Sequence, residues 1–108
     1  MNDQNAKADA GKYRPSIVPM RELIKDIAAV REYGDKKYGD TNSWQRVDRE
    51  RYVDALGRHT IEFLDNPTSR DEESGLPHLW HIACNVAFLC EMYKEADTEL
   101  LEKCGFEL

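Results

Sequence analysis

Residues 78–93, with the sequence HLWHIACNVAFLCEMY, decide the fold of this chain. Apolar residues recur in this segment at the three-, four- and seven-residue spacing of one α-helical face; they are Leu79, Ala83, Val86, Ala87, Cys90 and Tyr93. A second stripe at the same spacing is polar and consists of His78, His81 and Asn85. The segment therefore predicts a helix that begins between residues 71 and 77, reaches about residue 96 and carries both stripes on its inner side.

Two earlier segments have the same helical spacing. Within residues 19–33 the regularly spaced apolar residues are Leu23, Ile24, Ile27, Ala28 and Val30. Pro19 suits the first turn of this helix, and Gly34 suits its end unless one more turn follows through Tyr38. A second helix should begin at Asp48, a favourable N-cap, and end near Leu64. Its inner face is expected to consist of Tyr52, Ala55, Leu56, His59, Glu62 and Phe63.

The remaining segments predict little regular structure. Residues 1–11 are small and polar without periodicity, which predicts a disordered arm. Residues 14–19 predict an extended lead-in, because a residue that precedes proline avoids the helical region. Thr98 is expected to cap a short final helix through Lys103. No alternating run bounded by turns indicates a strand. We therefore expect an all-α fold of three main helices and a short C-terminal helix, with residues 12–108 as a single domain.

Composition limits the classes of partner. The chain has 108 residues, 15 Lys and Arg against 21 Asp and Glu, and a formal net charge of −6. This balance argues against DNA or an anionic membrane as partner. No apolar run approaches the roughly 20 residues of a membrane span, and the N-terminus does not resemble a signal peptide. Three cysteines without a C-x-x-C pair suggest free thiols in a reducing compartment, so we expect a cytoplasmic protein.

Chain length also bears on assembly. A domain of this size buries only about two thirds of its surface, so polar residues on the inner side of a helix compete with core residues for space. Packing between subunits is one way to recover burial. We therefore expect a homo-oligomer, a dimer or higher.

The second helix carries the first candidate site. His59 and Glu62 are three residues apart and so share one helical face, which their neighbours predict to be the inner one. A buried carboxylate is costly without a metal ion, a cation or hydrogen-bond donors. The two residues are therefore candidate metal ligands, although a hydrogen bond between them at a helix contact would also explain the pattern.

The third helix supplies the second candidate site. His78, His81 and Asn85 together are unusual for packing alone, although packing stays an alternative. Imidazole and carboxylate ligands suit Mn, Fe, Co, Ni or Zn better than Ca, and imidazole also donates to phosphate. Asp71 and Glu73 precede this helix and can supply carboxylates to the mouth of the site. They can equally serve only to favour the helix N-terminus.

A basic segment follows the first helix and suggests a phosphate ligand. Its members are Arg31, Lys36, Lys37, Arg46, Arg49 and Arg51. In an acidic protein this cluster is a candidate clamp for a triphosphate, with Trp44 or Tyr38 available to stack on a base. A solvated charged face is the alternative. Neither a Walker A loop nor a G-x-G-x-x-G motif is present.

Four blocks of the sequence resemble a known family, the phage-associated dATP/dGTP diphosphohydrolase N-terminal domain. The blocks are REYGDKKYG (31–39), NSW (42–44), RYVDALGRH (51–59) and ESGLPHLWHIACN (73–85). That family is similar to the all-α nucleotide pyrophosphohydrolases of the MazG kind. The resemblance implies a MazG-like helical bundle completed by oligomerisation, a purine (deoxy)nucleoside triphosphate as substrate, and cleavage to the monophosphate and pyrophosphate. A phage-encoded member would act in the host cytoplasm.

The resemblance also implies a metal site of a modified kind. MazG enzymes hold Mg²⁺ through E-x-x-E and E-x-x-D on two helices, where this chain has His59-x-x-Glu62 and His78-x-x-His81. We therefore expect Mg²⁺ or Mn²⁺ bound by His59, Glu62, His78 and His81. The expected catalytic carboxylates are Glu62, Asp71 and Glu73. The expected nucleotide-binding residues are Lys36, Lys37, Tyr38, Trp44, Arg51 and Asn85.

Two other functions fit the same residues. A protein that captures a nucleotide without cleaving it needs fewer carboxylates than a hydrolase, which matches a motif where His replaces acids. A structural oligomer with a buried polar network is the other alternative.

Overall fold

The computed structural model describes residues 6–105, and over these residues the chain forms helices without a β-strand. The elements in chain order are η1 (Pro15–Ile17), α1 (Met20–Tyr38), η2 (Ser43–Arg46), α2 (Arg49–Asp65), α3 (His78–Met92) and α4 (Lys94–Lys103). An isolated β-bridge joins Arg70 to Pro77 in the loop between α2 and α3. The all-α prediction is confirmed.

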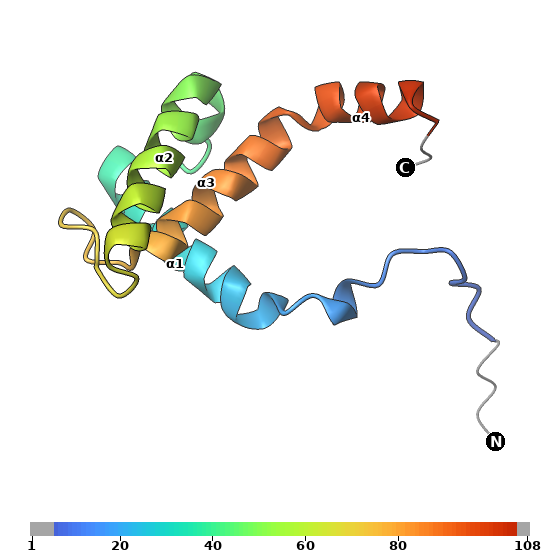
Figure 1. Cartoon of the computed structure of the whole chain (residues 1–108), viewed down its shortest axis with the longest axis horizontal. Coiled ribbons are helices and arrows are strands. Elements are labelled where there is room, and N and C mark those ends of the chain that lie inside the picture. Colours follow the sequence, from blue (N-terminus) through green and yellow to red (C-terminus); the bar gives the residue numbers. More distant parts are fainter. Residues whose placement is uncertain (1–5, 106–108) are drawn as a thin grey trace.

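Helix α3 is the centre of the fold. It packs against α2 and against α1, while α4 follows it and leads away from the other helices (Figure 1). The most buried side chains of the described residues all lie on α3: Cys84 is 2% exposed, His78 7% and Asn85 8%. Two of these three side chains are polar. The segment predicted to decide the fold therefore carries its most buried residues, and its polar stripe does face inward.

Helix α1 ends where the longer of the two predicted helices would end. Gly34 does not stop the helix, which continues one more turn to Tyr38. The stop is Gly39, which adopts the left-handed conformation (φ 69°) and donates its N–H to the Asp35 carbonyl at 2.8 Å. A left-handed C-terminal residue is most easily a glycine. The added turn brings Lys37 and Tyr38 to the functional site described below.

The other helix ends confirm some predictions and correct others. Helix α2 begins directly after Asp48, as predicted, although the Asp48 side chain forms no capping hydrogen bond. The third helix ends at Met92, earlier than expected, because a turn at Tyr93 separates it from α4. Thr98 therefore lies inside α4 and not at its start; its hydroxyl donates to the Lys94 carbonyl at 2.8 Å.

The N-terminal segment is described only in part. Residues 1–5 of the expected disordered arm lie outside the described residues, and residues 6–11 are exposed and non-helical. The prediction of an extended segment at residues 14–19 is wrong for Pro15–Ile17, which form a 3₁₀ turn closed by hydrogen bonds to the Arg14 and Pro15 carbonyls. Among the described residues no helix is both long and apolar enough to cross a membrane.

Large apolar side chains remain exposed on all four α-helices, including Leu23 and Ile24 on α1 and Leu100 on α4. On α2 they are Val53, Ile61 and Leu64, and on α3 they are Leu79 and Val86. The radius of gyration is 17.8 Å, against about 13 Å for a compact chain of this length. The large radius reflects the N-terminal segment and α4, which project from the packed helices (Figure 1). The exposed apolar side chains agree with the expected self-association, which stays a prediction.

Candidate functional site

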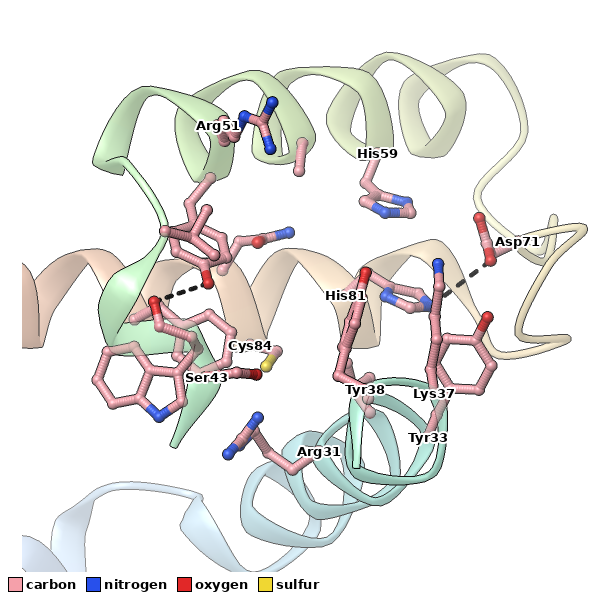
Figure 2. Close-up of a pocket in the computed structure, with 18 of the residues that line it drawn as sticks. Arg31, Tyr33, Lys37, Tyr38, Ser43, Arg51, His59, Asp71, His81 and Cys84 are labelled. Atoms are coloured by element: carbon pink, nitrogen blue, oxygen red, sulfur yellow. Dashed lines mark hydrogen bonds and ion pairs between the residues drawn. The ribbon is translucent and has the colours of Figure 1, made fainter. Parts of the chain in front are cut away.

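A cavity of about 530 Å³ lies between α1, α2, α3 and the segment that contains η2 (Figure 2). Helices α2 and α3 run antiparallel along it, so residues near the end of α2 face residues near the start of α3. As a result the cavity has two chemically different ends. One end carries imidazole and carboxylate groups, and the other carries aromatic rings.

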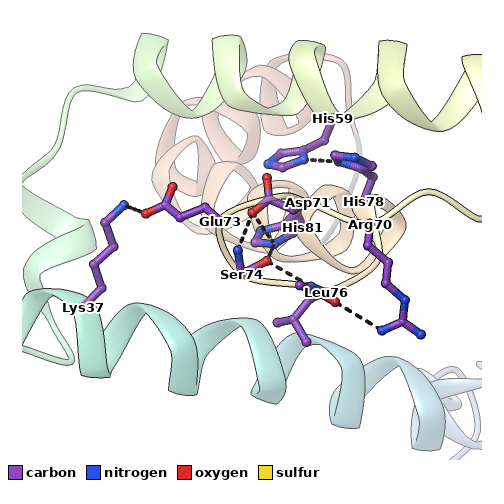
Figure 3. A network of polar contacts seen from close by, with 10 residues as sticks. Lys37, His59, Arg70, Asp71, Glu73, Ser74, Leu76, His78 and His81 are labelled. Atoms are coloured by element: carbon purple, nitrogen blue, oxygen red, sulfur yellow. Dashed lines mark hydrogen bonds and ion pairs between the residues drawn. The ribbon is translucent and has the colours of Figure 1, made fainter.

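Three histidines and an aspartate form the polar end. His59 of α2 lies with its Nδ1 2.8 Å from the Nδ1 of His78 on α3. The ring of His59 also stacks on that of His81, with centroids 4.5 Å apart and planes 5° apart. Asp71 lies in the loop, with its Oδ2 3.9 Å from the Nε2 of His81. Figure 3 shows these four side chains converging from the two helices and the loop.

The loop between α2 and α3 fixes Asp71 through a tight turn. The Asp71 N–H donates to the Leu76 carbonyl at 2.8 Å, and the Gly75 N–H donates to the Asp71 carbonyl at 2.8 Å. Gly75 has a φ of 73°, which a residue with a side chain rarely adopts. The Ser74 N–H donates to Asp71 Oδ2 at 2.8 Å, and the Ser74 hydroxyl lies 2.6 Å from His81 Nε2. The turn therefore holds the carboxylate and the imidazole in fixed positions.

The ionisation of this cluster suits metal binding. Burial, with repulsion from His81, lowers the pKa of His59 to about 4. Burial also lowers the pKa of His81. Burial acts to raise the pKa of Asp71, but hydrogen bonds from Ser74 outweigh it and leave the pKa below its ordinary value. Near neutral pH, His59 and His81 thus offer neutral imidazoles and Asp71 an ionised carboxylate, the forms that coordinate a cation.

The positions of the donor atoms also fit a metal ion. One ligand atom each from His59, Asp71 and His78 can be chosen so that all lie within 4.8 Å of one another. Two ligands bound at right angles to one ion are about 3 Å apart when each bond is about 2.1 Å, and the two Nδ1 atoms are separated by 2.8 Å. Two imidazoles and one carboxylate suit Mn, Fe, Co, Ni or Zn better than Ca. The residues present therefore fit a divalent transition-metal ion.

Basic residues line the cavity along its length. Arg31 and Lys37 come from α1, and Arg51 and Arg58 come from α2. Lys37 is paired with Glu73, and this pairing lowers the pKa of Glu73. Within residues 6–105, the three arginines form no ion pair with Asp or Glu. In a chain of net charge −6, unpaired cations concentrated at a cavity favour an anionic ligand.

The aromatic end is built around Phe88 of α3. The ring of Trp44 stacks on it with centroids 4.6 Å apart and planes 12° apart, and the ring of Tyr52 is tilted against it at 5.1 Å. The Tyr52 hydroxyl donates to the Trp44 carbonyl at 2.8 Å, which ties η2 to α2. These contacts form a firm apolar wall of the kind on which a base stacks.

Most of the predicted site residues meet at this cavity. The residues that line it are Lys37, Tyr38, Trp44, Arg51, His59, Asp71, Glu73, His81 and Asn85. His78, the remaining histidine of the cluster, is buried and does not line the cavity, but its Nδ1 contacts that of His59. Asn85 has no hydrogen-bond partner for its amide within residues 6–105, so this group is available to a ligand.

Two predicted residues lie elsewhere. Glu62 and Lys36 are exposed and do not line the cavity. The expectation that Glu62 faces inward is wrong. Residues three apart on a helix are about 60° apart around its axis, and His59 stands at the edge of the buried face, so Glu62 points past it. The metal-binding and catalytic roles expected of Glu62 stay untested predictions that the geometry does not favour.

Two lining residues, Arg58 and Phe88, and one residue that contacts the site, Ser74, were not singled out as site residues from the sequence. Arg58 lies seven residues after Arg51 on the same face of α2, a spacing that could have indicated it. Phe88 follows Asn85 by one turn on the polar stripe of α3. Ser74 gave no sequence signal for its contact with His81, because that contact depends on how the loop folds back.

Comparison with known proteins gives two matches. Residues 2–100 match the family described as "dATP/dGTP diphosphohydrolase, N-terminal". A protein of Salmonella phage PMBT28, named dATP/dGTP diphosphohydrolase, is 37% identical over 83 residues, which are 77% of this chain. The matched part is 28% of the phage protein, so this chain spans well under half of that relative. No solved structure matches the chain.

Proposed function

The chain belongs to the dATP/dGTP diphosphohydrolase N-terminal family, and from this we propose that its cavity binds a purine (deoxy)nucleoside triphosphate and hydrolyses it to the monophosphate and pyrophosphate. The observation that carries the proposal is the shared cavity. His59 and Asp71, which have metal-ligand spacing together with His78, line the same space as the unpaired arginines and the aromatic wall. Each group matches one part of such a substrate.

In this proposal His59, Asp71 and His78 hold a divalent metal ion, Mn²⁺ or Mg²⁺. The donor set favours Mn²⁺, because imidazole is a poor ligand for Mg²⁺. A bound divalent ion would polarise a phosphate oxygen and lower the pKa of water. The remaining site residues then act on the substrate directly.

Arg58, next to His59 on α2, offsets the charge of the phosphates, and Lys37 does so from α1. Arg51, next to Tyr52, lies toward the aromatic end of the cavity. Lys37 can reach a phosphate only by leaving Glu73, its present partner. Release of Glu73 frees a carboxylate at the cavity that can accept a proton from the attacking water. The Asn85 amide orients the substrate from α3. Trp44 supplies the apolar surface for the base.

The test is an assay of pyrophosphate release. The purified chain is incubated with dATP, dGTP, dCTP and dTTP in the presence of Mn²⁺ or Mg²⁺, and the products are separated by ion-exchange chromatography. We expect purine monophosphates and pyrophosphate with Mn²⁺, and loss of both in Asp71→Asn and His78→Ala. Equal rates in these variants and the wild type would place the activity at another site.

A capture protein is the second candidate, and one observation favours it. Asp71 is the one carboxylate among the three candidate ligands, since Glu62 points away from the cavity. A site with a single carboxylate can bind a nucleotide without holding the several metal ions that a hydrolase of the MazG kind uses. Recovery of uncleaved nucleotide on the protein, unaffected by chelator, would support this function.

A further inference from the structure

The two ends of the cavity are separated by the same length of helix on both walls. On α2, Tyr52 of the aromatic end precedes His59 of the polar end by seven residues, and on α3, His81 precedes Phe88 by seven. Seven residues of helix span about 10 Å. This length fits an extended nucleotide whose phosphates lie at the histidines and whose base lies at Phe88. The position of the base is therefore set by the position of the phosphates.

Arg31 is the cationic residue that contacts Phe88 at the aromatic end, where Arg51 of α2 also lines the cavity. The Arg31 guanidinium carbon lies 5.2 Å from the centroid of the Phe88 ring. The same side chain is partly buried, lines the cavity, and donates from Nη2 to the Thr41 carbonyl. Figure 2 shows the guanidinium pointing from α1 toward the end of the cavity that η2 closes, away from His81. The other basic residue of α1 at the cavity, Lys37, points to the polar end and pairs with Glu73.

The Arg31 guanidinium is held in a defined place but keeps free donors. Arginine has five N–H donors, and the Thr41 carbonyl accepts from one nitrogen. The loop that presents this carbonyl is itself fixed, because the Thr41 hydroxyl donates to Asp35 Oδ1 at 2.6 Å. Within residues 6–105 no carboxylate neutralises the group. A fixed planar donor beside a base-stacking surface can read the edge of a base.

The base edge that accepts hydrogen bonds from such a donor is that of guanine. Guanine presents two acceptors side by side, O6 and N7, and a guanidinium donates to both at once. Adenine presents N7 beside the N6 amino group, which is itself a donor and meets the guanidinium unfavourably. We propose that Arg31 makes the site selective for 6-oxopurine nucleotides over 6-aminopurine nucleotides by donating to O6 and N7. This inference rests on the proposed nucleotide site.

The test compares the binding of three nucleoside monophosphates, which the enzyme cannot cleave further to pyrophosphate. Isothermal titration in Mn²⁺ measures the Kd of dGMP, dIMP and dAMP for the whole chain. Hypoxanthine in dIMP keeps the 6-oxo group and lacks the 2-amino group. Its affinity therefore shows whether the 6-oxo group or the 2-amino group of guanine is recognised. We expect dGMP and dIMP to bind with similar affinity, each about tenfold or more tighter than dAMP, the discrimination of one bidentate base contact.

Two variants of Arg31 then test whether this residue causes the preference for dGMP over dAMP. Arg31→Lys keeps the charge but loses the planar fork, and Arg31→Met loses both. We expect the dGMP-to-dAMP affinity ratio to fall toward one in both variants, mainly because dGMP binds less tightly. Arg58→Met, beside His59 at the polar end of the cavity, should weaken the binding of all three nucleotides by the same factor and leave the affinity ratio unchanged. Arg21→Met, exposed on the same helix and outside the cavity, should change nothing.

The outcomes separate this inference from the proposed function. An unchanged ratio in Arg31→Lys and Arg31→Met, or an equal loss of all three ligands, overturns the role of Arg31 while the nucleotide site stands. Equal binding of dIMP and dAMP to the wild type also overturns it, and needs no variant. If none of the three nucleotides binds the wild type, the proposed function fails together with the inference.

Discussion

His59 and His78 face each other across 2.8 Å through their Nδ1 atoms, one from α2 and one from α3. Two neutral imidazoles at this distance share one proton in a hydrogen bond when no cation is present. With a metal ion between them, both Nδ1 atoms would have to be free of protons. The pair is thus a hydrogen bond that a metal ion can replace, and it lies where the two central helices meet (Figure 3).

Removal of either imidazole should abolish specific metal binding. In His59→Ala and His78→Ala, the metal retained after dialysis against Mn²⁺ or Zn²⁺ should fall to background, because a single imidazole and Asp71 hold an ion weakly. Glu62→Gln is the matched control on the same helix and should keep wild-type metal content, since Glu62 is exposed outside the cavity. Inductively coupled plasma spectrometry gives the content. A loss confined to Glu62→Gln would restore that residue as a ligand.

The stability of the metal-free protein should depend on pH in one direction. The pKa of His59 is about 4 in the folded chain and about 6.5 in an unfolded one, so the unfolded state binds the proton more readily. The free energy of unfolding should therefore rise as the pH increases from about 4 to about 6.5, and level off above. His81 acts in the same direction.

Urea unfolding in EDTA at pH 5 and pH 7.5 measures this dependence. We expect a lower midpoint at pH 5, and a smaller difference between the two midpoints in His59→Gln, which no longer titrates. A midpoint at pH 5 equal to or above that at pH 7.5 would contradict the depressed pKa of His59.

The Lys37–Glu73 pair should affect catalysis more than stability. Its side chains are 39% and 59% exposed, so its loss should change the free energy of unfolding by less than about 1 kcal/mol. In the proposed mechanism, however, Glu73 accepts a proton after Lys37 turns to the phosphates. Glu73→Gln should therefore lower kcat at least about tenfold with little change in KM, whereas Lys37→Met should mainly raise KM. Steady-state kinetics measure both effects. Equal kcat and KM for Glu73→Gln and the wild type would show that Glu73 is not the proton acceptor.

Trp44 should contribute to nucleotide affinity but not to pyrophosphate affinity. Stacking on an aromatic side chain contributes about 1–3 kcal/mol per base by alanine substitution, so Trp44→Ala should raise the Kd of dGMP at least about fivefold. The Kd of inorganic pyrophosphate, which has no base, should stay as in the wild type. A parallel loss for both ligands would mean that Trp44 only supports the fold, through its stacking on Phe88.

The sequence predicted the helices well because their apolar spacing is a local property. It placed α2 within one residue at its start and identified the inward polar stripe of α3. The end of α1 was less certain, because both Gly34 and Gly39 can end a helix. In the structure Gly39 takes the left-handed conformation, and the added turn pairs Lys37 with Glu73 of the α2–α3 loop.

The sequence predicted the kinds of side chain at the site better than the particular residues that form it. His59, His78, His81 and Asp71 were all named from spacing and from position before α3, and the structure brings them together. Glu62 was misplaced because helical spacing gives the angle between two residues but not the edge of the buried face. The spacing from Arg51 could have indicated Arg58, whereas the role of Phe88 depends on the packing of Trp44 and Tyr52 against it.

The most direct test of the account is a single-turnover experiment. A limiting amount of dGTP is mixed with excess protein and Mn²⁺, with and without EDTA, and the bound and free nucleotides are identified after quenching. The account predicts equal amounts of dGMP and pyrophosphate with Mn²⁺ and intact dGTP with EDTA. Recovery of intact dGTP bound to the protein in both samples, with no pyrophosphate formed, would contradict metal-dependent hydrolysis and identify a protein that captures the nucleotide.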